Sequence, residues 1–290
     1  MDLQAQPVVL RDGFRPGKPY LAFFRSGPRS LHRRILDEDP RRNWDICVNW
    51  WSEPGACPDL DMQTVAGGNK YEGFLDFMRH AAFLGQYRYV LLLDDDVCFR
   101  PGDVSRLFEL CDRHQLYLSQ PALLRSTHFN HIVTAQNPLC EVRRVSFVEV
   151  MAPCFSAEAL RDLSHTFGLT RSTCGIDLAW ASLLRDRDLI RIVDAVAVEH
   201  TKPVDPSGGA FYLKLRAMGV DVHEEVADIM RRFPAFGGTR TLRGGHIYRA
   251  GVPRIMAAAG AELADLAIRL RFGVPDALRL LRNRARTALG

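Results

Sequence analysis

Short apolar runs alternate with segments of helical periodicity in this sequence, and that alternation limits the possible folds more than any other feature. Residues 20–24, 44–50 and 89–93 are largely apolar runs of the length of one buried strand. Residues 69–83 and 101–111 place apolar side chains at helical spacing. Strands that alternate with helices form mostly parallel sheets with helices on both faces. We therefore predict a Rossmann-like α/β fold, with a mostly parallel central sheet flanked by helices.

The same alternation continues as far as His200, where a polar, glycine-rich stretch begins. Ser156 has the residue type of a helix N-cap, and an acid follows it in the first turn. The further predicted strands are residues 116–118, 145–151, 190–193 and 195–198, and the further predicted helices are residues 156–163, 176–184 and 211–218.

Composition excludes several classes of protein. The 290 residues are 47% hydrophobic, enough for a sizeable core, and the formal net charge of +4 is too weak to indicate a nucleic-acid partner. The seven cysteines never form a CxxC pair, so we expect neither a zinc knuckle nor a disulfide framework, and a reducing cytoplasm is the expected compartment. The sequence begins without a secretory leader and contains no run of roughly 18 apolar residues, so we expect no membrane span.

Familiar nucleotide and hydrolase motifs are missing from the sequence. It contains no GxGxxG, no GxxxxGK[ST] and no GxSxG. Interpretations as a dinucleotide-binding protein, a Walker-type NTPase or an α/β-hydrolase therefore lose their main support.

Three consecutive carboxylates, Asp94, Asp95 and Asp96, directly follow the apolar run that ends at residue 93. Ligands of open α/β sheets bind just beyond the carboxyl ends of the strands. Hard divalent cations such as Mg²⁺ and Mn²⁺ take carboxylate oxygens together with substrate phosphates. The cluster therefore indicates a metal-assisted phosphate site, and the alternative is a solvated acidic loop at a helix start.

A second polar group, His200 with Lys202, follows the last predicted strand. An imidazole and an ammonium at that edge could both face a diphosphate. A single histidine is more often structural, so the interpretation of His200 as a metal ligand depends on its combination with Asp96.

Two further acids occupy positions that call for an explanation. Asp177 begins a predicted helix of otherwise apolar residues, where it is either a general base or a favourable first-turn acid. Glu149 interrupts the apolar run 145–151, so it must be paired, exposed at a sheet edge or functional.

Lys70 follows a Gly-Gly loop, where it either approaches a ligand or is a plain surface lysine.

The run LLLDDDV resembles the DxD motif of the nucleotide-sugar glycosyltransferases of the GT-A fold. Four further segments look like an uncharacterised family of GT-A-like proteins, a domain of unknown function. The resemblance covers roughly residues 18–205, and its segments are SQPAL (119–123), FVEVMAPCFS (147–156), GIDLAW (175–180) and VDAVAVEH (193–200).

This resemblance implies a site and a reaction. Asp94 would contact the ribose or sugar of the donor, Asp96 and His200 would ligate Mn²⁺ or Mg²⁺, and Asp177 would be the base of an inverting transfer. Glu149 would lie near the donor sugar or the acceptor.

We assign the remaining polar groups to donor binding, on the chemistry of the leaving group. Lys202 with the metal would stabilise charge on a departing diphosphate. Asp95 and Lys70 complete the predicted donor-binding set. The expected donor is a nucleoside-diphosphate sugar, with UDP as the expected nucleotide, and the expected acceptor is a glycan or a lipid-linked glycan. The alternatives are a metal-dependent phosphate or nucleotide hydrolase and a carbohydrate-binding protein without activity.

The C-terminal part of the sequence differs from the rest. We predict a catalytic domain over residues 18–235 and a helical extension over residues 236–290. In the extension, leucines and alanines alternate with Arg269, Arg271, Arg279, Arg282, Arg284 and Arg286, which is a basic amphipathic pattern. Such a helix either packs on the body with a solvated arginine face or lies on the inner surface of a membrane.

Overall fold

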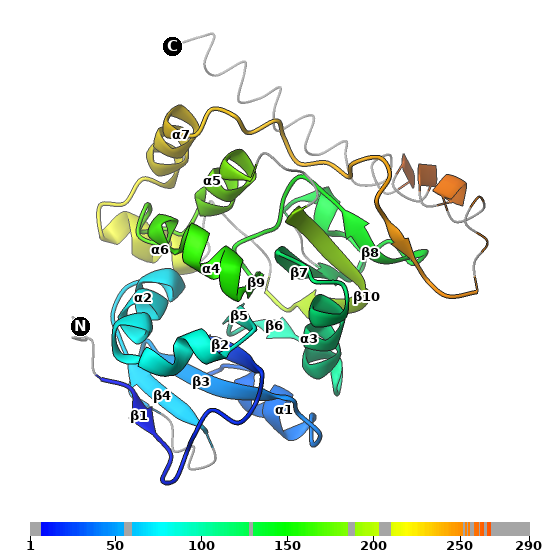
Figure 1. Ribbon diagram of the computed structural model, residues 1–290. Helices are drawn as coiled ribbons and strands as arrows, with labels where there is room; N and C mark the ends of the chain where they lie inside the picture. Colours follow the sequence, from blue (N-terminus) through cyan, green and yellow to red (C-terminus); the bar gives the residue numbers. More distant parts are fainter. Residues whose placement is uncertain are drawn as a thin grey trace.

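The protein is built around a large central sheet with helices on both faces (Figure 1). The computed structural model describes residues 7–54, 60–127, 130–184, 189–202 and 210–251, together with separate residues between 253 and 267. The sheet and its flanking helices confirm the predicted fold class, a mixed α/β fold with a mostly parallel sheet.

The sheet has the strand order β1-β4-β3-β2-β5-β9-β7-β10-β8-β11, with β6 paired to β10 outside this path. Parallel pairing joins β4, β3, β2 and β5, and it also joins β7 to β10. β9 lies between these two groups and is antiparallel to both, so six strands point in one direction. The strands are β1 (Val9–Leu10), β2 (Tyr20–Ser26), β3 (Trp44–Trp50), β4 (Met62–Val65), β5 (Tyr89–Asp94), β6 (Val97–Cys98), β7 (Leu118–Leu123), β8 (Cys140–Arg144), β9 (Cys154–Ser156), β10 (Ile190–His200) and β11 (Ile247–Tyr248).

The helices follow the strands in the predicted alternation. The N-cap predicted at Ser156 is present, since its side chain accepts from the Ala159 amide, and the Asn69 side chain accepts from the Glu72 amide in a capping box that was not predicted. The α-helices are α1 (His32–Asp37), α2 (Lys70–His80), α3 (Asp103–Arg113), α4 (Ala157–Leu163), α5 (Ile176–Leu183), α6 (Ala210–Ala217) and α7 (Val222–Arg232), of which α1 and α7 were not predicted.

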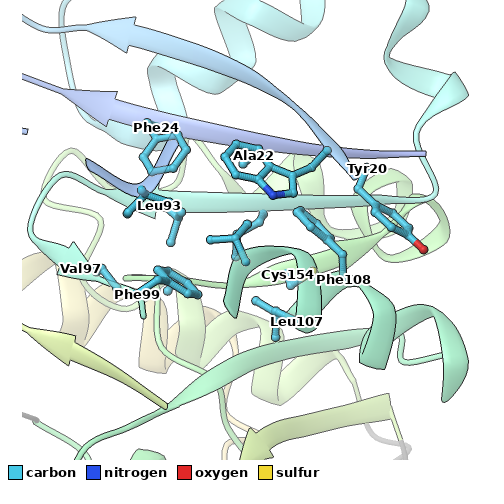
Figure 2. Close-up of a cluster of buried hydrophobic side chains, with 14 of the residues drawn as sticks. Tyr20, Ala22, Phe24, Leu93, Val97, Phe99, Leu107, Phe108 and Cys154 are labelled. Carbon is cyan, nitrogen blue, oxygen red and sulfur yellow. The ribbon is translucent and has the colours of Figure 1, made fainter. Parts of the chain in front are cut away.

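Alternate residues of the central strands supply two separate cores. In β2, Tyr20, Ala22 and Phe24 belong to the core beneath α3, while Leu21 and Phe23 belong to the core beneath α2, α4 and α5. Figure 2 shows side chains of the first core converging from β2, β5 and α3. Burial on both faces explains why these strands are continuous apolar runs rather than alternating ones.

The strands predicted at residues 116–118 and 145–151 differ from the structure, the first in its bounds and the second in its type. The strand predicted at residues 116–118 is instead β7, and it contains the whole SQPAL segment. Pro121 is accepted inside this strand because β9 pairs only with Leu118 and Ser119, so its missing amide removes no bond to β9.

Residues 145–151 do not form the predicted strand. Val145 makes one isolated bridge to Thr241, and the Ser146 hydroxyl donates to the Gly238 carbonyl. The Glu149 amide donates to the side chain of Gln120. Backbone bonds to strands occur at its two ends, from the Val145 amide to Ile190 of β10 and from the Asp94 amide of β5 to Met151. Between these ends the segment forms no strand ladder, so the apolar run is a buried loop.

The strands predicted at residues 190–193 and 195–198 are one strand, β10, whose register shifts between Val193 and Ala197. Asp194 lies at this irregularity and is fully buried. Its carboxylate accepts two hydrogen bonds from Arg143, at 3.0 and 3.1 Å, and one from the Asn137 amide at 2.8 Å. A buried carboxylate needs such partners, and here they hold β8 and β10 together.

The segment after α7 returns to the sheet edge. Residues 238–242 bond to Arg144 and Ser146, and β11 then pairs with β8. Described residues between 255 and 267 have helical conformation, and most of the basic tail lies outside the described residues. Among the described residues, no helix is long and apolar enough to cross a membrane.

Candidate functional site

The carboxyl ends of β5 and β10 bring the acidic cluster and His200 together. Asp94 ends β5, Asp95 and Asp96 form a turn, and β6 then pairs antiparallel with the end of β10, with Val97 opposite His200. The Thr201 amide and hydroxyl both donate to the carbonyl of Asp96, at 3.0 and 2.9 Å. This local ladder brings together residues more than one hundred positions apart.

Asp96 has two cationic neighbours. Nε2 of His200 lies 3.7 Å from Oδ1 of Asp96, and Nζ of Lys202 lies 3.3 Å from Oδ2. Burial tends to raise the pKa of Asp96, but His200 and Lys202 outweigh it and the net shift is downward. Burial tends to lower the pKa of His200, and Asp96 reverses that shift upward. Asp96 is therefore held as a carboxylate at the centre of the cluster.

The backbone of His200 is fixed by a residue that sequence analysis missed. Thr127 Oγ1 accepts from the His200 amide at 2.8 Å and lies 2.7 Å from the His200 carbonyl, to which it donates. A single threonine in a loop has no sequence signal that distinguishes it from any other.

Lys70 lies inside the site, so its interpretation as a surface lysine is wrong. The residue is 4% exposed, and its ammonium lies 3.0 Å from Oδ1 of Asp94. It also donates to the carbonyls of Val150 and Met151 at 2.7 and 2.8 Å. Burial lowers the pKa of Lys70, and Asp94 opposes this shift. The ammonium thus joins the acidic cluster to the loop that contains Glu149.

That loop connects both halves of the site through the backbone of Val150. The Val150 carbonyl accepts from Lys70 and from the Tyr71 hydroxyl, both at 2.7 Å. The Val150 amide donates to Oδ2 of Asp177 at 3.4 Å. Asp94 and Asp177 are therefore linked through three polar contacts that pass through Lys70 and Val150.

Asp177 lies in the first turn of α5, as predicted, and it is 6% exposed. Gly175 precedes the helix with a φ of 91°, and a Cβ there would lie 3.3 Å from Ile229, so this turn requires glycine. Burial raises the pKa of Asp177 to about 6; His131 opposes the shift and Glu149 adds to it. A carboxyl with such a pKa exchanges protons near neutral pH.

Glu149 is buried beside Asp177 and lacks a full set of partners. Its Oε1 accepts from Asn130 at 3.2 Å, while Oε2 has no hydrogen-bond partner among the described residues. Its negative charge contributes an upward shift to the pKa of Asp177, Lys70 and His200, and for Lys70 burial outweighs this contribution. The unpartnered oxygen of a buried carboxylate marks a place where a ligand can donate a hydrogen bond.

Arg25, at the end of β2, supports this edge of the sheet and was also missed. Its guanidinium donates to the carbonyls of Ala66 and Gly68 at 2.9 and 2.8 Å, and to the side chain of Asn49. Burial lowers the pKa of Arg25 to about 10, a value at which it remains charged. The arginine directly follows the predicted strand 20–24, and no sequence pattern separates it from a surface residue.

The structure therefore brings all eight predicted site residues to one region at the carboxyl edge of the sheet. Asp95 is included, with Oδ1 lying 3.3 Å from Nζ of Lys202. Asp96 offers a carboxylate oxygen of the type that Mn²⁺ and Mg²⁺ accept, and His200 offers an imidazole nitrogen, which transition-metal ions accept more readily than Mg²⁺ does; Mg²⁺ sites commonly use few protein ligands. Within the described part of the chain, no group of three or more His, Cys, Asp or Glu side chains could hold a metal ion by itself. The pair fits a metal that takes its remaining ligands from water and substrate.

Comparison with known proteins gives matches at the level of structure alone. No protein-family model and no curated protein sequence matches this chain. A crystal structure of GalNAc-T7 with UDP, GalNAc and Mn²⁺ matches with a TM-score of 0.49 and 9% identity, over 74% of this chain and 47% of that chain. A structure of Staphylococcus aureus TarS with UDP-GlcNAc matches with a TM-score of 0.44 and 10% identity, over 75% of this chain and 73% of that one.

These two matches are partial. The chain spans less than half the length of the GalNAc-T7 chain. With both TM-scores below 0.5 and identities of about a tenth, they support no conclusion about what this chain binds. The chemistry of the site has to be argued from its own residues.

Proposed function

We propose that the protein is a metal-dependent glycosyltransferase that moves a sugar from a nucleoside diphosphate, with UDP as the expected nucleotide, to a glycan or lipid-linked glycan. One observation carries this proposal: Asp96 and His200, which we propose as the metal ligands, share the carboxyl edge of a parallel sheet with Asp177, a buried carboxyl of pKa about 6. The sequence resemblance to GT-A glycosyltransferases supports the same reaction.

The first half of the proposed site handles the donor. Asp96 and His200 would hold the divalent ion, which when bound neutralises charge on the departing diphosphate. Lys202, at the exposed side of the cluster, supplies a second positive charge for the phosphates. Asp94 and Asp95 provide acceptor oxygens for donor hydroxyl groups, and Lys70 holds Asp94 in place.

The second half handles the acceptor. Asp177 accepts the proton of the attacking hydroxyl, which strengthens that oxygen as a nucleophile. Attack from the face opposite the diphosphate inverts the anomeric centre, so we propose an inverting transfer. Glu149, with its unpartnered oxygen, accepts a hydrogen bond from the sugar or the acceptor.

Calorimetric titration of UDP with and without Mn²⁺ tests the donor half. We expect metal-dependent binding by the wild type and its loss in Asp96→Ala. Asp37→Ala is the matched control, because it removes an exposed carboxylate that forms an ion pair with Arg33, outside the proposed site. Absence of binding by any nucleoside diphosphate with any divalent ion would refute the proposal.

Product analysis then separates the proposed transfer from the alternatives. Incubation with a panel of UDP-sugars and glycan acceptors should yield a glycosylated acceptor and UDP. Release of free sugar or phosphate without transfer to an acceptor would favour the hydrolase. Binding of donor with no turnover would favour the non-catalytic carbohydrate-binding protein.

A further inference from the structure

Lys202 places a positive charge on Asp96, the carboxylate that the proposed metal would use, and on its neighbour Asp95. Its Nζ lies 3.3 Å from Oδ1 of Asp95 and 3.3 Å from Oδ2 of Asp96. The lysine side chain is 53% exposed, whereas those of Asp95 and Asp96 are 18% and 17% exposed. The ammonium therefore approaches the two recessed carboxylates from the solvent side.

The cluster needs a cation whether or not a metal is bound. Three neighbouring carboxylates repel one another, and the ammonium of Lys70 lies against Asp94. Lys202 is the neighbour that compensates Asp95 and shares Asp96 with His200. A divalent ion on Asp96 would repel this ammonium, so the two cations compete for one carboxylate.

Lys202 can leave without disturbing the backbone. Its neighbour Thr201 is fixed by two hydrogen bonds to the carbonyl of Asp96, so the lysine side chain can move while the backbone at Thr201 stays in place. That side chain is long, flexible and half-exposed. Lys70 has no such freedom, because it is buried and its ammonium is held by backbone carbonyls.

We propose that Lys202 is an exchangeable counter-ion that occupies the Asp95 and Asp96 carboxylates until a nucleoside diphosphate draws it away and leaves Asp96 to the metal. This inference rests on the proposed function. The phosphates offer the ammonium a stronger partner than the carboxylates do, and they also contribute ligands to the metal. Metal and diphosphate therefore strengthen each other's binding, and by reciprocity the effect is equal in both directions.

Titration of Mn²⁺ alone into the wild type and into Lys202→Gln tests this competition. We expect the variant to bind Mn²⁺ about fivefold more tightly, because it loses two competing ion pairs that are each weak at an exposed position. Lys18→Gln is the matched control: it removes one positive charge from an exposed lysine whose ammonium donates to the Arg42 carbonyl. The control should bind Mn²⁺ as the wild type does.

The same titration in the presence of UDP tests the exchange. We expect UDP to increase the Mn²⁺ affinity of the wild type, and to increase that of Lys202→Gln by a factor at least about fivefold smaller. Equal Mn²⁺ affinity of wild type and Lys202→Gln without nucleotide would overturn the inference.

The outcomes separate this inference from the proposed function. If the wild type binds Mn²⁺ and UDP and Asp96→Ala does not, while Lys202→Gln behaves as the wild type, only the counter-ion role is wrong. If the wild type binds neither Mn²⁺ nor UDP, both proposals are wrong. Melting temperatures measured without metal would show whether each variant is folded before its affinity is compared.

Discussion

A carboxylate as deeply buried as that of Asp177 is unfavourable for stability. Burial raises its pKa from 3.8 to about 6, so the folded chain holds this proton more tightly than the unfolded chain does. The folded state is therefore penalised above about pH 6, by up to about 3 kcal/mol, and the penalty disappears as the pH falls towards 4. A residue retained at such a cost is typical of a functional site.

Asp177→Asn should accordingly separate activity from stability. We expect the transfer rate to fall by about 10²- to 10⁴-fold, because no general base remains, while stability at pH 8 rises. In the wild type, the rate should increase with pH through about 6 as Asp177 loses its proton. Urea unfolding at pH 5 and pH 8 and a pH–rate profile measure both effects. Unchanged activity with an unchanged pH profile would exclude Asp177 as the base.

At the scale of elements, the loop after β8 joins the two halves of the site. The Val150 carbonyl accepts hydrogen bonds from Lys70 and Tyr71 of α2. The Val150 amide donates to Asp177 of α5. The position of this loop thus depends on side chains from helices on either side of it in the chain.

Lys70→Met should show how far the loop depends on the buried ammonium. The carbonyls of Val150 and Met151 would lose a donor and Asp94 its counter-charge, so we expect a loss of about 2 kcal/mol or more in the free energy of unfolding. Lys18→Met, at an exposed lysine, should change it by less than about 0.5 kcal/mol. If Lys70→Met weakened donor binding while stability stayed at the wild-type value, Lys70 would be a donor contact rather than a support for the loop.

The elements themselves were predictable where local signals agreed. Asn69 and Ser156 cap α2 and α4, and the runs in β2, β3 and β5 are apolar because both sheet faces are covered. The run 145–151 carried the same apolar signal, and it is a loop in which backbone amides donate to Gln120, Asp177 and Arg240. Apolar composition reports burial and does not report whether a neighbouring strand is present.

At the scale of the whole molecule, the described residues beyond β11 lie outside the proposed site. Described residues there expose large apolar side chains, with Ile255 at 86%, Leu263 at 65% and Leu266 at 51%. In sequence, these residues precede the arginines of the predicted amphipathic helix.

We propose that this tail docks on anionic lipid, where a lipid-linked acceptor would be found. The full chain should bind vesicles containing phosphatidylglycerol, and binding should weaken as salt is raised. Deletion of the residues after Gly260 should abolish vesicle binding and leave UDP binding intact. Vesicles of phosphatidylcholine alone are the control for charge. Equal vesicle binding by the full and truncated chains would contradict a membrane role for the tail.

The sequence by itself determined the α/β class, the central strands β2, β3 and β5, five of the seven described α-helices, and the candidate chemistry of residues such as Asp96, His200 and Asp177. These follow from local information: hydrophobic period, helix caps, and carboxylates placed at the ends of apolar runs. Tertiary structure alone decided that Lys70 is buried, that Val150 links Asp94 to Asp177, and that Lys202 shares Asp96 with His200. Each of these facts joins segments far apart in the chain. The pairing of β6 with β10 brings Lys202 to Asp96, and the contacts of Val150 with Lys70 and Asp177 join the loop to α2 and α5.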